Sequence, residues 1–410
     1  MTVKTACADL AIFGKAPAFT EPLHVGRPNI GSRERLLARI NDMLDRRWLS
    51  NRGPFVQELE AEIARRLGVK HCIAMCNGTV ALEIAIRALG LAGEVIVPSF
   101  TFIATAHSLQ WQKITPVFCD IGERTHTLDP AAVERMITPR TTGIIGVHLW
   151  GRPCDIDALT EIANKRNLQL LFDASHAFGC SAQGWSIGNF GRAEVFSFHA
   201  TKFCNTFEGG AITTNDNVLA AKIRLMKNFG FAGYDNVIYI GTNGKMTEIC
   251  AAMGLTSLES LDDFIRANRA NYDAYRRRLA GLPGVRMLEF DEAEGCNYQY
   301  VVIEIDESLT GISRDLILRI LHAENVLARR YFYPGCHRME PYRSYFPHTD
   351  LLLPNTNAVA RRVLVLPTGT TVREEDIDAI CGIIRMCITH GRDLVSAVSE
   401  VEATSTAQVS

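Results

Sequence analysis

The stretch Glu194–Asp216, EVFSFHATKFCNTFEGGAITTND, contains two short strand patterns joined by a loop that carries a lysine. Residues 194–199 are largely apolar, and a pair of glycines leads into the second strand pattern over 210–215. A lysine removed from water at such a place has a lowered pKa, as a nucleophilic amine requires. Lys202, taken alone, is also compatible with a surface lysine whose aliphatic part covers apolar residues.

The alternation of short strands with helices extends over a much longer part of the chain, from about residue 55 to residue 216. The expected strands are 94–98, 115–120, 142–150, 168–175, 194–199 and 210–215, and the helical patterns between them include 80–90 and 155–167. Several strands are apolar throughout, as expected where helices cover both faces of a sheet. The pattern predicts an α/β fold with a mostly parallel, doubly wound sheet. Ligands bind such sheets beyond the carboxyl ends of the strands.

The pattern changes near residue 260, which predicts a second domain. A long helix over 261–285 leads to a strand at 298–306, a helix at 313–324 and a closing helix near 373–389. We expect an N-terminal arm over 1–30, a large domain over 31–260 and a smaller α+β domain over 261–392. Residues 393–410 include many small and polar residues and lack periodicity, so we predict a disordered tail.

The composition excludes several classes of protein. Of the 410 residues, 47% are hydrophobic and 21% charged, and the net charge of -2 provides no basic excess for nucleic acid. No apolar run approaches the roughly 20 residues of a membrane span, and the N-terminus lacks a signal peptide. The twelve cysteines are scattered, so we expect no zinc or other metal site and a reduced, cytoplasmic protein. The chain also lacks the GxGxxG and P-loop motifs.

Three further features lie where the expected strands end. Asn77, Gly78 and Thr79 begin a helix, and a helix N-terminus binds phosphate readily, although an ordinary N-cap is an equally simple explanation. Asp173 closes an apolar strand and requires a cation or a capping role, because an unpaired buried carboxylate is costly. His176 follows on the same side.

Phe102 also follows a strand, and its aromatic ring belongs either to the core or against a planar ligand. A phosphate cradle, a carboxylate, a flat ring and a desolvated lysine fit one ligand together. That ligand is pyridoxal phosphate (PLP), which needs a lysine for its Schiff base and an acidic partner for its ring nitrogen.

The motifs that carry these residues also resemble those of a known family. CNGT (76–79), EVIVPSFTFIATA (94–106), LLFDASHAFG (170–179), the stretch 194–216 and GTNGKM (241–246) are similar to the ordered motifs of the DegT-type nucleotide-sugar aminotransferases. These enzymes belong to the aspartate aminotransferase superfamily and have the type I PLP fold. Within the family, LHVGRPN (23–29), WLSNRGP (48–54), GVHLWGRPC (146–154) and YFYPGCH (331–337) resemble the TDP-4-keto-6-deoxyglucose 4-aminotransferases.

The resemblance implies a role for each motif residue. Lys202 would form the Schiff base and move protons, and Asp173 would pair with the ring nitrogen. The other implied cofactor contacts are Phe102 on the ring, Gly78, Thr79 and Ser197 on the phosphate, and His176 near the ring hydroxyl. Asn243 of GTNGKM would reach the phosphate bound to a neighbouring subunit, which implies a homodimer with shared sites. The expected substrate-binding residues are Arg27, Asn29, Asn51, His199, Tyr331 and His337.

The implied reaction transfers an amino group from glutamate to C4 of a TDP-4-keto-6-deoxyhexose, for antibiotic or other deoxysugar biosynthesis. The alternatives are amination at C3 or of another keto sugar, and a non-catalytic PLP-binding regulator. A dehydratase branch of the family has histidine in place of the Schiff-base lysine, so Lys202 argues against it. The residues before the first motif show no helix-turn-helix pattern, which argues against a regulator.

Overall fold

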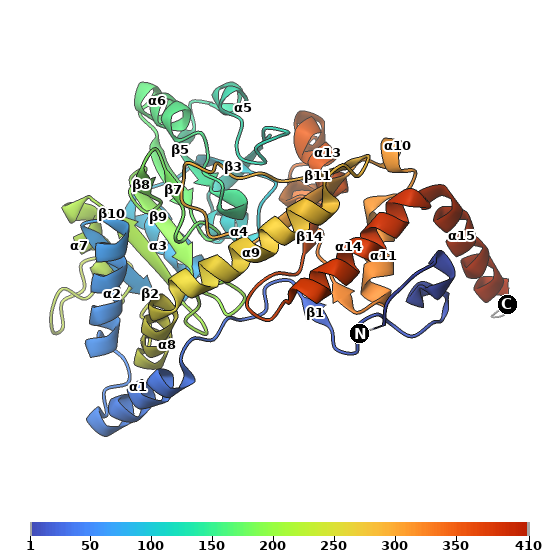
Figure 1. Cartoon of the computed structure of the whole chain (residues 1–410). Helices are drawn as coiled ribbons and strands as arrows, with labels where there is room; N and C mark the ends of the chain where they lie inside the picture. Colours follow the sequence, from blue (N-terminus) through green and yellow to red (C-terminus); the bar gives the residue numbers. More distant parts are fainter. Residues whose placement is uncertain (1, 408–410) are drawn as a thin grey trace.

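The computed structural model describes residues 2–407 and contains a large sheet beside a smaller one (Figure 1). Within those residues, seven strands form the large sheet in the order β2-β10-β9-β6-β5-β3-β4. Their bounds are β2 His71–Met75, β3 Glu94–Pro98, β4 Thr115–Cys119, β5 Thr141–Val147, β6 Gln169–Asp173, β9 Ala193–Ser197 and β10 Gly210–Thr214. β10 is antiparallel to both neighbours, and the other adjacent pairs are parallel. The six predicted strands are all present, and β2 is additional.

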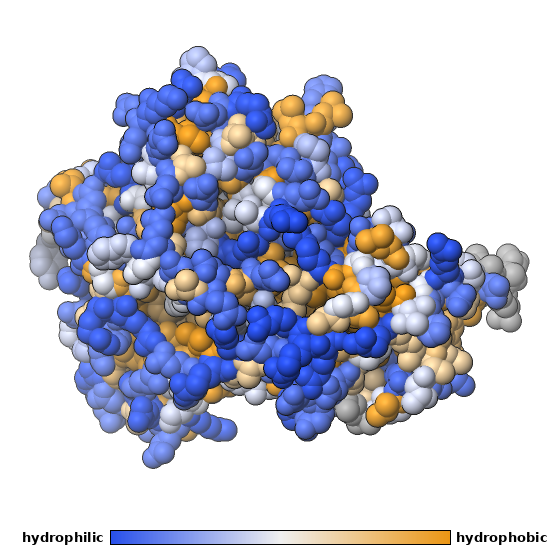
Figure 2. All heavy atoms as spheres, turned by 45° about the horizontal axis from the view of Figure 1, so that its top comes forward, coloured by the Kyte–Doolittle hydropathy of each residue, from blue (hydrophilic) through white to orange (hydrophobic). Residues whose placement is uncertain are grey.

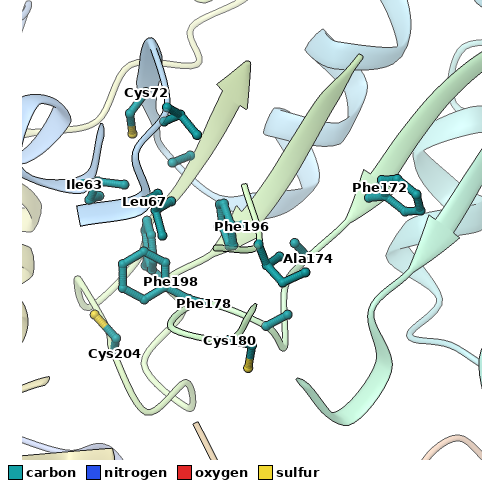
Figure 3. Packing of buried hydrophobic residues seen from close by; sticks show 14 of the residues in the cluster. Ile63, Leu67, Cys72, Phe172, Ala174, Phe178, Cys180, Phe196, Phe198 and Cys204 are labelled. Carbon is teal, nitrogen blue, oxygen red and sulfur yellow. The ribbon is translucent and has the colours of Figure 1, made fainter. Parts of the chain in front are cut away.

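Helices cover both faces of this sheet, as the uninterrupted apolar strands predict. The helices of the large domain are α1 Arg33–Arg46, α2 Pro54–Leu67, α3 Gly78–Ala88, α4 Ala104–Gln110, α5 Pro130–Met136, α6 Ile156–Arg166, α7 Asn217–Met226 and α8 Glu248–Glu259. Successive strand residues point to opposite faces, so Leu171 packs in one core and Phe172 in the other. Figure 3 shows part of the second core, where Phe178 meets Phe196 edge-on at 5.5 Å between ring centres.

The smaller domain begins with α9 Leu261–Leu279, which runs from the large domain towards the second sheet in Figure 1. That sheet has the order β11-β12-β14 and is antiparallel. The elements that follow α9 are β11 Val285–Met287, β12 Val301–Ile305, α10 Glu307–Thr310, α11 Arg314–Ala323, β13 Val326–Leu327, η4 Cys336–Arg338, α12 Tyr342–Tyr345, η5 Thr349–Leu352, α13 Pro354–Arg362, β14 Val363–Leu366 and α14 Glu374–Thr389. Apolar residues of α9, α11 and α14 form the core of the smaller domain with its sheet. Cys336 of η4 and Tyr342 of α12 are instead buried in a core of the large sheet.

The N-terminal arm is held against this smaller domain. β1 Leu23–His24 pairs in parallel with β13, and the short helices η1 Cys7–Asp9 and η2 Ala11–Phe13 lie beside it. The buried carboxylate of Glu324 accepts hydrogen bonds from the backbone N–H groups of Ala11 and Ala18, both at 2.6 Å. Leu10 is part of the core. The arm therefore stabilises the same domain that contributes to the cavity described below.

The predicted disordered tail is wrong for residues 393–407, because α15 spans Gly391–Ala407. Leu394 and Val398 lie one helical turn apart and are both buried in the small-domain core. These two residues form a very short apolar stripe. Such a helical pattern is easily overlooked in a sequence of mostly small and polar residues. Residues 408–410 of the predicted tail lie outside the described residues.

The surface is mainly hydrophilic on the face shown in Figure 2, with apolar side chains in small groups. Among residues 2–407, no helix is long and apolar enough to cross a membrane. All twelve cysteines lie in the described part of the chain, and all are free thiols.

Candidate active site

A cavity of about 620 Å³ opens where β5, β6 and β9 end. Residues that follow β2 and β3 also line it, and the small domain adds Tyr300, Tyr331 and Phe332. The predicted site residues that line this cavity are Gly78, Thr79, Phe102, Asp173, His176, Ser197, His199, Lys202 and Tyr331. The fold thus brings together residues from five separate sequence motifs.

The N-terminus of α3 forms one corner of the cavity. The side chain of Asn77 accepts a hydrogen bond from the backbone N–H of Val80 at 2.8 Å and caps the helix. The N–H groups in the first turn of a helix have no partner within the helix and favour an anion. A Cβ on Gly78 would lie 3.1 Å from the Cβ of Ser197, so the missing side chain permits their close approach. This corner fits a phosphate group.

Asp173 lies at the end of β6 and is almost fully buried. Its Oδ2 accepts a hydrogen bond from the hydroxyl of Thr105 at 2.9 Å, and its Oδ1 accepts one from the backbone N–H of Ser175 at 3.1 Å. The two donors fix the direction of the carboxylate. The site therefore offers an oriented anion to a protonated ring nitrogen.

His176 lies in the loop after β6 and is buried. Its Nδ1 accepts a hydrogen bond from the backbone N–H of Trp150 at 3.3 Å. Burial, and secondarily the charge of Lys202, lower the pKa of His176 well below its ordinary value. The ring is therefore neutral, and its remaining proton is on Nε2, which can donate to a ligand.

Lys202 is half-buried in the loop between β9 and β10, where its backbone N–H donates to the carbonyl of His199 at 2.8 Å. Burial lowers the pKa of Lys202 to about 8, although the charge of Asp173 acts in the opposite direction. A substantial fraction of this side chain is a neutral amine near pH 8. The chain can therefore use it as a nucleophile and as a proton carrier.

The mouth of the cavity carries polar and aromatic side chains. His199 contacts the hydroxyl of Thr201 through Nδ1 at 2.8 Å and the carboxylate of Glu208 through Nε2 at 3.3 Å. Phe102 is 59% exposed, as befits a ring that can cover a planar ligand. Tyr331 lies under the guanidinium of Arg329, with 5.0 Å between the ring centre and Cζ.

Residues 31–385 match the family model described as the DegT/DnrJ/EryC1/StrS aminotransferase family. The chain belongs to this aminotransferase family. A dTDP-4-amino-4,6-dideoxy-D-glucose transaminase from Shigella dysenteriae is 38% identical over 89% of this chain and 99% of its own length. A GDP-perosamine synthase from Caulobacter vibrioides is 37% identical over 87% of this chain and 96% of its own.

Several solved structures share the fold. DesI, crystallised in the presence of its TDP-sugar product, has a TM-score of 0.92 and 51% identity over 96% of this chain and 99% of that one. DesV from S. venezuelae, in complex with a ketimine intermediate, has a TM-score of 0.80 and 31% identity over 87% of this chain and 95% of that one. The aminotransferase therefore has the predicted type I fold of PLP-dependent enzymes.

Two residues predicted to bind substrate lie outside the lining of this cavity and make hydrogen bonds within the chain. Asn29 is 2% exposed, donates to the carbonyl of Phe203 at 3.1 Å and accepts from the hydroxyl of Thr370 at 2.8 Å. His337 is equally buried. Its Nδ1 contacts the hydroxyl of Ser99 at 2.6 Å, and its Nε2 contacts Asp350 at 3.0 Å. In a sequence, a polar loop residue that hydrogen-bonds to another segment of the chain cannot be told apart from one that binds a ligand.

Three other predicted residues lie outside the lining of this cavity. Arg27 and Asn243 are exposed. Asn51 lines a separate cavity of about 290 Å³ together with Arg52 and Lys245. A single chain does not bring these residues into the lining of the cavity that contains Lys202.

Sequence reasoning missed several residues of the aminotransferase cavity. Tyr300 and Phe332 line it from the small domain, and Thr105 orients Asp173 from behind. Tyr300 was included in a predicted strand, but β12 begins one residue later. The only signal available was the aromatic content of 298–300 and 331–333, which a hydrophobic core explains equally well.

Proposed function

We propose that the protein is a PLP-dependent aminotransferase that moves an amino group from glutamate to C4 of a TDP-4-keto-6-deoxyhexose. The product would be TDP-4-amino-4,6-dideoxyglucose, an intermediate of deoxysugar biosynthesis and of antibiotic glycosides. The main support for this reaction is that Lys202 and Asp173 line the same cavity, beside the N-terminus of a helix. The sugar and the position of amination rest on the similarity to DesI and to the Shigella transaminase.

The cavity residues would hold the cofactor at both of its ends. Gly78, Thr79 and Ser197 would bind the phosphate, and the carboxylate of Asp173 would accept a hydrogen bond from the protonated ring nitrogen. His176 would donate from Nε2 to the ring hydroxyl, and Phe102 would cover a ring face. When bound, PLP supplies an aldehyde carbon that takes up the amino group and a ring that withdraws electrons from the reacting carbon.

Lys202 performs the proton transfers in this proposal. Its neutral amine accepts the proton from the α-carbon of the donor amino acid and returns a proton to the cofactor side. In the second half of the cycle the transfer runs in reverse: the neutral amine accepts a proton from the cofactor side, and the ammonium so formed delivers that proton to the sugar carbon. A pKa of about 8 suits both directions, because the two protonation states have similar free energies near neutral pH.

A homodimer is part of the proposal, with Asn243 reaching the cofactor phosphate held by the neighbouring subunit. The segment 229–240 exposes apolar side chains in close succession, which a monomer in water disfavours. These include Phe229, Phe231, Val237, Ile238 and Ile240, each at least 40% exposed. Asn243 follows this segment directly and is itself exposed. A second copy of the chain that covers the segment would meet Asn243 as well.

A reducing compartment, the cytoplasm, completes the proposal. Twelve free thiols, most of them buried, support it because disulfides form readily in oxidising compartments.

The test of the function is competition between TDP-linked 4-keto and 3-keto isomers, with a GDP-linked 4-keto sugar as a third arm. The GDP arm is included because relatives are GDP-perosamine synthases. With glutamate as donor, NMR of the product should show nitrogen on C4 of the TDP sugar. A preference for the 3-keto isomer would overturn the position of amination and leave the transaminase proposal intact. Loss of visible colour with glutamate but no amino sugar from any arm would indicate a regulator instead.

A further inference from the structure

Behind His176 lies a chain of three buried side chains that does not line the cavity. The indole Nε1 of Trp150 donates a hydrogen bond to Nδ1 of His126 at 3.2 Å. His126 then donates from Nε2 to Oε1 of Glu304 at 3.1 Å. Trp150 and His126 have no measurable exposure, and Glu304 is 7% exposed. Buried polar groups are retained only where each has a partner, and these three satisfy one another.

The row of hydrogen-bonded side chains formed by Trp150, His126 and Glu304 connects the two domains. Trp150 lies in η3 Leu149–Gly151, which follows β5 of the large sheet. His126 lies in the loop after β4, and Glu304 is on β12 of the small domain. Glu304 also pairs with Arg286 and with Arg362, whose Nε lies 3.3 Å from Oε2. The carboxylate is therefore held by two arginines of the small domain in addition to its hydrogen bond with His126.

Two of these residues adopt a backbone conformation that bulky side chains rarely occupy. His126 has φ of 62° and Trp150 has φ of 64°, both in the left-handed region. Such conformations are costly and persist only where the surroundings hold them. The hydrogen bonds and the tight packing around both rings provide that restraint here.

Trp150 contacts His176 with both its backbone and its indole ring. The backbone N–H donates to Nδ1 of His176 at 3.3 Å, which places the imidazole proton on Nε2. The indole plane lies 25° from the imidazole plane at 6.0 Å between centres, and 20° from Phe332 at 5.4 Å. The ring centre of Tyr300 lies 4.6 Å from the centre of the imidazole. The direction and tautomer of His176 therefore depend on where Trp150 sits.

We propose that Trp150, held by His126 and Glu304, is a positioning residue that keeps His176 in one tautomer with Nε2–H directed to the cavity. This inference rests on the proposed function, because His176 acts on the ring hydroxyl of PLP only if PLP is the ligand. It adds a consequence for the whole molecule. Glu304 belongs to the small domain and holds Trp150 through His126. The position of His176 at the cofactor ring therefore depends on the position of the small domain.

The charged groups around the chain are consistent with a neutral histidine pair. Glu304 contacts His126, Arg286 and Arg362. Burial lowers the pKa of His126, and Glu304 only partly offsets this effect. The charges of Arg152 and Arg286 also lower the pKa of His126. The facing charge near His176 is Lys202, which also disfavours protonation. Both imidazoles therefore stay neutral, as the two hydrogen bonds from Trp150 to Nδ1 atoms require.

The experiment uses Trp150→Phe, which keeps a flat ring and removes the indole N–H. Its matched control is Tyr275→Phe, because Tyr275 is also fully buried and donates one ring hydrogen bond, to the carbonyl of Pro367 at 3.0 Å. The first measurement is PLP affinity of the apoenzyme by absorbance titration. The second is the tautomer of His176 from ¹⁵N spectra of histidine-labelled apoenzyme, with the signal assigned by its absence in His176→Gln.

For Trp150→Phe we expect about three- to tenfold weaker PLP binding, the effect of roughly one lost hydrogen bond. We also expect the His176 signals to move from a single neutral tautomer towards a mixture. Tyr275→Phe should change neither measurement. His126→Asn provides a second variant, since asparagine tolerates a left-handed φ, and it should weaken binding in the same range.

Two results would overturn the proposal. One is wild-type PLP affinity and an unchanged His176 tautomer in Trp150→Phe, or in His126→Asn should the first variant not fold. The other is an equal shift in Tyr275→Phe, which would mean that general destabilisation explains the effect. Because PLP affinity is measured without any sugar substrate, a failure here is distinguishable from a failure of the proposed sugar specificity.

Discussion

The inner and outer parts of the cavity differ in how the chain holds their side chains. At the inner part, Asp173 is 5% exposed and its two oxygens each have a donor. At the outer part, two residues expected to bind substrate are exposed: His199 at the mouth of the cavity and Arg27 outside the cavity lining. One chain therefore builds a rigid place for a cofactor, whereas the residues expected to bind the sugar nucleotide are exposed to solvent.

This difference has a physical origin. The inner residues lie at the ends of buried strands, where packing on both faces of the sheet fixes the backbone to within small displacements. The outer residues lie on loops, which carry function because they can vary and adjust. Changes at the inner part should consequently affect the chemistry itself, and changes at the outer part should affect substrate affinity.

The largest effect is expected for Lys202→Ala, because no other amine lines the cavity in the described chain. We expect the single-turnover rate with glutamate to fall by at least about 10⁴-fold, the upper range for general acid–base catalysis. Circular dichroism should show an unchanged fold. Lys165→Ala, at an exposed lysine of α6, is the control and should keep full activity. A comparable rate in Lys202→Ala would refute its role.

A smaller loss is expected for Asp173→Asn, which keeps the shape of the side chain and removes its charge. We expect the glutamate half-reaction to slow by about 10²- to 10³-fold, a typical cost of removing one preorganised electrostatic contact. Asp120→Asn is the matched control: Asp120 is also buried and accepts from the backbone N–H groups of Asn355 and Thr356, away from this cavity. Near-wild-type rates in Asp173→Asn would show that the ring nitrogen has another partner.

The pH dependence of cofactor loading tests the state of Lys202. Its neutral amine is the reactive form, and burial lowers its pKa from 10.5 to about 8. The rate at which apoenzyme gains visible absorbance with PLP should therefore be about tenfold higher at pH 9 than at pH 7. In Asp173→Asn the midpoint should move lower, because Asp173 raises the pKa of Lys202. A midpoint near 10.5 would contradict the desolvated lysine.

The smallest effect is expected at Thr105, which does not line the cavity but donates a hydrogen bond to Asp173. Thr105→Val removes the hydroxyl that donates to Asp173, while the shape of the side chain is nearly kept. We expect about three- to tenfold slower turnover with glutamate, the effect of one hydrogen bond to a charged group in a site that keeps its other donor. Thr310→Val removes a buried hydroxyl that donates to the carbonyl of Ile312 at 2.9 Å, and it should change stability only. Equal rates in both variants would mean that Ser175 alone orients Asp173.

The sequence predicted the inner part of the site well because strand ends combine two readable signals. An apolar run specifies the strand, and a polar residue directly after it marks the edge of the sheet, as at Asp173 and Ser197. The spatial order of the strands was not needed, because all carboxyl ends of parallel strands face the same edge.

The sequence predicted the outer part less well, since the role of a loop residue depends on what folds against it. Asn29 and His337 resemble ligand-binding residues but are occupied by hydrogen bonds within the chain. Tyr300 and Trp150 have the opposite property: they look like core aromatics, yet they contact His176. The helix α15 was missed because two buried residues, Leu394 and Val398, are enough to dock it on an existing core.

The most direct test of a site completed by two subunits is complementation between Lys202→Ala and Asn243→Ala. Each variant should be nearly inactive alone. A heterodimer formed by refolding a mixture contains one site with Lys202 from one chain and Asn243 from the other. Random pairing of equal amounts should therefore restore about one quarter of wild-type activity. Recovery no greater than the average of the two separate variants would contradict a site in which Lys202 of one chain works with Asn243 of its partner.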